Sequence, residues 1–164
     1  MLPRSCCYFW PNKIVLIASK MLKVQIKLFD QNLPLPEYKS AGAAALDLYS
    51  RLTMDLEPRQ VAYVPLNIAL QIPEDHFVLL SARSSLHKKG LMMANGIGIG
   101  DYDYRGDGDE YLAALYNFSD QVVKIEKGER LVQMLILKRE KIELEQLTVL
   151  PADNRGGFGS TGRK

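Results

Sequence analysis

The chain has 164 residues, 47% of them hydrophobic and 24% charged, which suits one folded domain with its own core. Its net charge of +2 is too close to zero to indicate a polyanionic partner, so we expect no stable binding to nucleic acid. The two cysteines, Cys6 and Cys7, are adjacent, which argues against a disulfide framework or a zinc site and favours a reducing, cytoplasmic setting.

The first twenty residues contain an apolar run that Pro-Asn-Lys interrupts at 11–13. The uninterrupted block at 14–18 is shorter than a signal-peptide core of about 7–15 residues, and a transit peptide would usually carry more arginine. It is also far shorter than the roughly 20 residues that cross a bilayer, so we expect no membrane association. We expect 1–20 to be an extension, disordered or loosely packed, ahead of a β domain at 21–152.

From Met21 onwards the pattern predicts β-strands. Residues 22–28 alternate strictly between apolar and polar, as a half-buried strand does, and short apolar runs separated by turn residues follow. Such spacing is typical of a sandwich or barrel. We predict strands at 22–28, 61–64, 68–72, 77–80, 111–117, 121–125, 130–137 and 143–147. A single short helix is predicted over residues 84–89, capped by Ser84.

Two segments carry groups suited to binding and cleaving a nucleotide. Glycines punctuate the stretch from Asn95 to Gly100, which predicts a tight hairpin whose main chain approaches a ligand and reads a flat base. Asp101 follows directly and is a candidate general base toward water. Arg83, with serines on its C-terminal side, provides donors for phosphate at a helix start. Taken singly, these are also consistent with a solvated turn and an ordinary helix cap.

Two further segments add polar groups among apolar ones. Arg130 and Gln133 lie on a predicted core strand at odd spacing, which places them on opposite faces of an ideal strand. The segment 153–164 has four glycines and one large apolar residue, Phe158, so it cannot offset its ordering entropy and is predicted to be a flexible arm. Its donors resemble those of phosphate-binding loops, and Phe158 is suited to stacking on a base. Polar edge residues and a plain terminus are the alternatives.

Taken together and in order, these segments resemble the trimeric deoxyuridine triphosphatase (dUTPase) family, from about Leu33 to Gly162. The most specific runs are Asp-x-Asp-Tyr-Arg-Gly at 101–106 and Gly-Phe-Gly-Ser-Thr-Gly at 157–162. The resemblance implies an all-β, jelly-roll-like barrel or sandwich with one short helix. It also implies a homotrimer with active sites at subunit interfaces, and Mg²⁺-dependent hydrolysis of dUTP to dUMP and pyrophosphate. That reaction limits uracil incorporation into DNA and supplies dUMP for thymidylate synthesis.

The resemblance also implies roles for individual residues. Asp101 would activate the attacking water, and Tyr104 would pack against deoxyribose and exclude a 2′-hydroxyl. Asp47 would reach Mg²⁺ through water. The remaining expected contacts are Asn95 and the main chain at Gly98 for uracil; Arg83 (also catalytic), Ser84, Ser85 and Gln133 for phosphate; and, from a neighbour's arm, Arg155, Gly159, Ser160 and Thr161 over the γ-phosphate with Phe158 covering uracil.

The sequence departs from the family pattern in three informative places. Gly100 replaces an aliphatic residue and is expected to loosen the hairpin, the stretch 107–110 is longer than usual, and the arm between Arg155 and Phe158 is shorter. Two alternative functions remain, the first because it shares the fold and the second because of Gly100 and the short arm. One is a dCTP deaminase relative, whose catalytic glutamate would fall near Ala114. The other is a non-catalytic, nucleotide-binding regulatory module.

Overall fold

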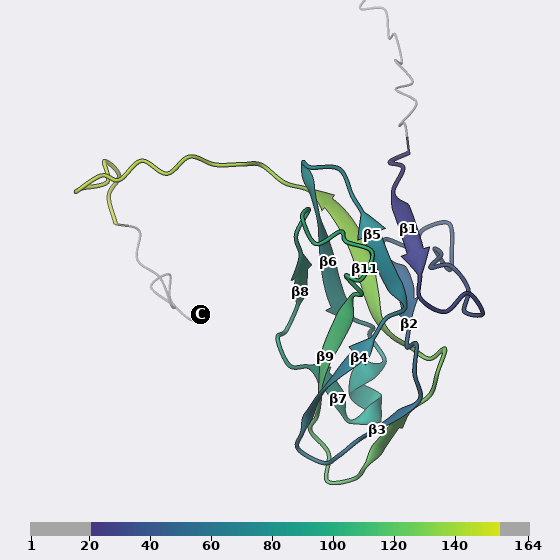
Figure 1. Ribbon diagram of the computed structural model, residues 1–164. Coiled ribbons are helices and arrows are strands. Elements are labelled where there is room, and N and C mark those ends of the chain that lie inside the picture. The colour runs from purple at the N-terminus through teal and green to yellow at the C-terminus, as the bar shows by residue number, and fades with distance from the viewer. Residues whose placement is uncertain (1–20, 155–164) are drawn as a thin grey trace, which may run out of the picture.

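The computed structural model describes residues 21–154, which form an all-β jelly roll (Figure 1). Its elements alternate short strands with turns and include one turn of 3₁₀ helix, η1. The elements are β1 (Gln25–Leu28), β2 (Leu46–Tyr49), β3 (Met54–Leu56), β4 (Val61–Pro65), β5 (Ile68–Gln71), β6 (His76–Ala82), η1 (Leu86–Lys89), β7 (Leu91–Met93), β8 (Gly98–Gly100), β9 (Leu112–Asn117), β10 (Val123–Ile125) and β11 (Arg130–Lys138).

The strands pair in two larger sheets and two small ones, and every pairing is antiparallel. One sheet has the order β2-β11-β6-β8 and another β4-β9-β7, while β1 pairs with β5 and β10 with β3. Side chains such as Leu48, Val78 and Leu115 are fully buried in the single core. Burying each stabilises the fold by about 1.5–3 kcal/mol before entropy is counted.

Most of the predicted strands are confirmed with shifted ends, but the strand predicted at 143–147 is wrong. Within the described chain, residues 139–150 contain no strand, and Ile142 and Leu144 are 78% and 86% exposed. Figure 1 shows this yellow segment leaving the domain after β11. An alternating pattern becomes a strand only where another strand pairs with it, and this segment meets none here.

Two local predictions around η1 and β8 also need correction. The helix cap is Ser85, not Ser84, and its side chain makes no capping hydrogen bond in the described structure; Gly90, at φ 78°, ends the turn. The predicted hairpin is also wrong, because β7 pairs with β9 whereas β8 pairs with β6. Gly96, at φ 71°, lets the connecting turn pass from one sheet to the other.

No helix among residues 21–154 is both long enough and apolar enough to cross a membrane.

Candidate active site

Asp101 opens onto a pocket of about 330 Å³ just beyond the end of β8. The same pocket is lined by Asn95 and Tyr104, so the structure brings together three residues that the sequence assigned to base, sugar and water. Asp101 is exposed, as a group that meets water must be. Gly98, by contrast, packs against Leu80 and is not among the residues that line this pocket.

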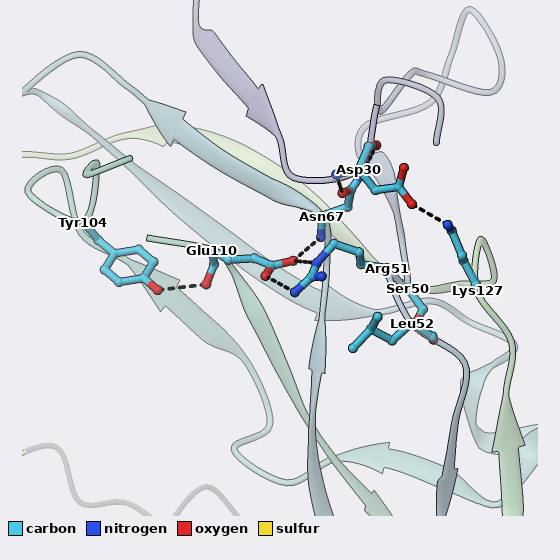
Figure 2. Close-up of polar contacts among 8 residues, drawn as sticks. All are labelled: Asp30, Ser50, Arg51, Leu52, Asn67, Tyr104, Glu110 and Lys127. Carbon is cyan, nitrogen blue, oxygen red and sulfur yellow. Dashed lines mark hydrogen bonds and ion pairs between the residues drawn. The ribbon is translucent and has the colours of Figure 1, made fainter. Parts of the chain in front are cut away.

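Tyr104 is held at both ends of its side chain. Its hydroxyl donates a 2.8 Å hydrogen bond to the carbonyl oxygen of Glu110, as Figure 2 shows. Its ring meets that of Tyr111 edge to face, with 5.3 Å between centroids. Partial burial, and then the carboxylates of Asp109 and Glu110, raise the pKa of Tyr104, so its hydroxyl keeps the proton that it donates.

Gly100 makes room for Tyr111. A Cβ atom at Gly100 would lie 2.5 Å from Cε1 and 2.7 Å from the hydroxyl of Tyr111. The expectation that this glycine loosens the segment is therefore wrong. Gly100 is buried and paired with Val78, and the ring of Tyr111, the residue just before β9, fills the space that a side chain at Gly100 would occupy. Burial raises the pKa of Tyr111 to about 12, and its buried hydroxyl has no partner within the described residues.

A second region gathers the phosphate candidates around Asp47. Arg83 donates from Nε to one carboxylate oxygen of Asp47 at 2.8 Å, and Arg130 donates from Nη1 to the other at 3.0 Å. Arg83 also donates to the carbonyl oxygen of Arg130 at 3.2 Å. Because Asp47 is buried and held in the fold, its two oxygens fix the positions of both guanidinium groups. The other N–H groups of these arginines remain for a ligand.

Two pockets, of about 500 and 450 Å³, share Arg83 as a wall residue. Ser85 lines the first, and Ser84 and Gln133 line the second. Five cationic side chains face two carboxylates across both pockets, which suits a polyanion. These are Lys39, Arg83, Lys88, Lys89 and Arg130 against Asp47 and Glu129.

A bulge in β11 corrects the prediction that Arg130 and Gln133 lie on opposite faces. The register with β2 shifts between Arg130 and Val132, and both Leu131 and Val132 are buried. The extra residue resets the alternation, so Arg130 contacts Asp47 while Gln133 pairs with Asp47 in the ladder. Both residues therefore belong to the Asp47 region.

The Asp47 region fits a cation held through water. Among residues 21–154 there is no group of three or more acidic, histidine or cysteine side chains suited to hold a metal directly. Each Asp47 oxygen has a second lone pair beyond its arginine bond and can accept a hydrogen bond from a metal-bound water. Direct ligands would come from the phosphates of a bound nucleotide, as Mg²⁺ commonly requires.

The two regions lie apart in one chain. Asp101 follows Gly100, which pairs with Val78, whereas Arg83 lies five residues further along β6 and its extension. At the usual rise per residue, Arg83 lies about 17 Å along the strand from Val78, the partner of Gly100. Arg155, Phe158, Gly159, Ser160 and Thr161, the expected arm residues, lie outside the described residues.

The sequence did not predict that Tyr111 lines the pocket, and it did not predict that Arg130 contacts Asp47. The unusual Gly100 was the available signal for Tyr111, because a missing side chain in a buried strand requires another group to fill its place. The arginine at 130 was noticed, but the bulge that turns it toward Asp47 has no simple sequence signal.

The all-β fold carries a pocket beside Asp101 and a separate cationic region around Arg83. Together these features place the chain among jelly-roll proteins that bind nucleotides. Comparison with known proteins gives the family: the dUTPase family model matches residues 31–162. A deoxyuridine 5′-triphosphate nucleotidohydrolase of Dictyoglomus turgidum is 38% identical over 149 residues, covering 87% of this chain and 99% of that protein. The chain belongs to the dUTPase family.

Solved structures agree with this assignment. The dUTPase of Streptococcus mutans superposes with a TM-score of 0.66 at 28% identity, covering 72% of this chain and 98% of its own. The dUTPase of Staphylococcus bacteriophage 80alpha, solved with dUPNHPP, gives a TM-score of 0.74 at 27% identity, covering 85% of this chain and 98% of its own.

Proposed function

We propose that this dUTPase hydrolyses dUTP to dUMP and pyrophosphate with Asp101 as the general base. The observation that carries the proposal is the exposed Asp101 carboxylate in one pocket with Asn95 and Tyr104. The oxygen of a water molecule forms a bond to the α-phosphorus while Asp101 accepts the proton of that water. The bond from the α-phosphorus to the α–β bridging oxygen breaks, and pyrophosphate leaves. Asn95 reads the uracil edge, and the Tyr104 ring packs where a 2′-hydroxyl would stand.

The Asp47 region is proposed to hold the triphosphate. Arg83 presents N–H groups to the phosphates and stabilises the charge that develops as pyrophosphate leaves, and Gln133 and the two serines add neutral donors. Bound Mg²⁺ would neutralise phosphate charge, with Asp47 accepting from a water on the ion. The expected arm at 153–164 would complete the site with Arg155, Phe158, Gly159, Ser160 and Thr161.

We further propose that the enzyme is a homotrimer whose sites combine residues from different copies. The separation of Asp101 and Arg83 within one chain supports this. So does the outer face of the β4-β9-β7 sheet, where exposed apolar side chains lie beside the Asp101 pocket. An apolar face of this kind usually marks an interface. Its exposed members are Val61, Tyr63, Met92 and Leu112. The composition of the chain favours a cytoplasmic location.

The deaminase alternative is not favoured, because the position that would carry its glutamate holds Ala114. This residue lies in β9 and lines the Asp101 pocket with a methyl group, which cannot accept or donate a proton. A non-catalytic module is also not favoured, since the relatives that are 38% and 37% identical to the chain are named nucleotidohydrolases.

Mixing two inactive variants tests both the chemistry and its assembly. Asp101→Asn and Arg83→Met are each expected to lose nearly all dUTP turnover. Co-refolded in equal amounts, they should regain about a quarter of parental activity. This follows because each of the two copies that form a site supplies its native residue in about half of the random trimers. Turnover of dUTP by the refolded mixture is the measurement. Asn95→Ala mixed with Asp101→Asn is the control and should gain nothing, since those residues share one chain's pocket. No gain in the first mixture would contradict a shared site.

A further inference from the structure

Glu110 closes the long stretch 107–110 with a carboxylate that is fully engaged. Arg51 donates to both of its oxygens, from Nε to Oε1 and from Nη2 to Oε2, each at 2.8 Å (Figure 2). The main-chain N–H of Asn67 donates a third hydrogen bond to Oε1 at 2.9 Å. The side chain of Glu110 is 11% exposed and that of Arg51 30%, so bulk water screens this pair only in part.

The groups that hold Glu110 are themselves fixed by the fold. Arg51 lies two residues after the end of β2, and its main-chain N–H donates a hydrogen bond to the carbonyl oxygen of Pro65 at 2.8 Å. Asn67 is 2% exposed and is held by side-chain hydrogen bonds with the main chain of Asp30. The pair therefore ties an exposed stretch between β8 and β9 to the body of the domain.

The same residue reaches the Asp101 pocket through its main chain. The carbonyl oxygen of Glu110 accepts a hydrogen bond from the hydroxyl of Tyr104, and the ring of the next residue, Tyr111, meets the ring of Tyr104 edge to face. Glu110 thus connects an ion pair remote from the pocket to the side chain proposed to pack against the sugar. Figure 2 shows the series of contacts from Arg51 through Glu110 to Tyr104.

We propose that Glu110, anchored by Arg51, is a positioning residue that sets how strictly the enzyme rejects a ribonucleotide. The inference rests on the proposed function, because it assumes that Tyr104 excludes the 2′-hydroxyl. Tyr104 can exclude the 2′-hydroxyl of a ribonucleotide only if its ring is held in a fixed position. Releasing Glu110 lets Tyr104 retreat, and UTP then gains access that dUTP does not need.

A double-mutant cycle separates this role from simple stabilisation. Glu110→Gln keeps the shape of the side chain but weakens the ion pair, and Tyr104→Phe removes only the hydroxyl. Each should lower the kcat/KM ratio of dUTP over UTP by about threefold to tenfold, the usual worth of one hydrogen bond. The double variant should show no further loss, because both changes break one connection. Arg51→Met approaches the pair from its other side and should match Glu110→Gln.

Asp120→Asn is the matched control, since it breaks an exposed ion pair with Arg59 and lies beyond the other end of β9 from Glu110. Its selectivity should equal that of the parent. Unchanged selectivity in Tyr104→Phe or in Glu110→Gln, or losses that simply add in the double variant, would overturn the inference while leaving dUTP hydrolysis intact.

A measurement free of turnover keeps the two proposals distinguishable. The ring-flip rate of ¹³C-labelled Tyr104, measured by NMR, should rise at least about threefold in Arg51→Met and Glu110→Gln and stay unchanged in Asp120→Asn. Faster flips in a chain that fails to hydrolyse dUTP would reject the proposed function alone. Unchanged flips in a chain that does hydrolyse dUTP would reject the positioning role alone.

Discussion

Replacing Asp101 with asparagine is expected to lower kcat for dUTP by about 10²–10⁴-fold with little change in KM. Asparagine has the same shape, and Asp101 is exposed at the pocket, so nucleotide binding survives. The amide cannot accept the proton of the attacking water, so the chemical step alone slows. Steady-state kinetics with dUTP and Mg²⁺ measures both parameters.

Asp107→Asn provides the control for a lost carboxylate on the same connection. Asp107 is exposed and forms a surface ion pair with Lys27, away from the residues that line the Asp101 pocket. Its kcat should stay close to that of the parent. An Asp101→Asn enzyme with parental turnover would show that another group accepts the proton.

Placing valine at Gly100 is expected to destabilise the fold by roughly 1–3 kcal/mol or more. The added Cβ meets the Tyr111 ring at 2.5 Å, a separation at which one of the two must move. Tyr111 is buried against Tyr104 and the core, so its ring has little freedom to yield. Urea unfolding of the parent and variant measures the loss, and dUTP turnover should fall as Asp101 shifts.

A compensating change distinguishes this explanation from a general intolerance of side chains. Combining Gly100→Val with Tyr111→Val removes the ring as it adds the branched side chain, so the double variant should recover much of the lost stability. Gly42→Ala, where a Cβ meets nothing within 4 Å, is the control and should stay within about 0.5 kcal/mol of the parent. A fully stable Gly100→Val protein would contradict the close packing of this pair.

The longest strands were all predicted from the sequence, because their pattern is long enough to show its period. β6, β9 and β11 have six or more residues each, whereas β2, with four, and β3, β7 and β8, with three each, were not predicted as strands. β10 is the exception, since it has three residues and lies within the strand predicted at 121–125. The pattern at 143–147 failed for the opposite reason, since alternation is local but pairing needs a partner elsewhere in the fold. Core and sheet class therefore follow from the sequence, while short edges and pairings do not.

The candidate site divides in the same way. Asn95, Asp101 and Tyr104 are close in sequence, and the motif that contains them predicted their shared pocket. The support beneath Tyr104 was not predicted, because Arg51 and Glu110 are 59 residues apart and no periodicity connects them. The bulge at Arg130 likewise reverses a face assignment that ideal alternation gives.

The most direct test of the account is to follow the products of the full chain with dUTP and MgCl₂ by ³¹P NMR. We expect dUMP and pyrophosphate in equal amounts, with turnover abolished by chelating the metal and UTP left almost untouched. Release of dUDP and inorganic phosphate, or equal consumption of dUTP and UTP, would contradict cleavage at the α–β bridge by a site that reads a deoxyuridine nucleotide.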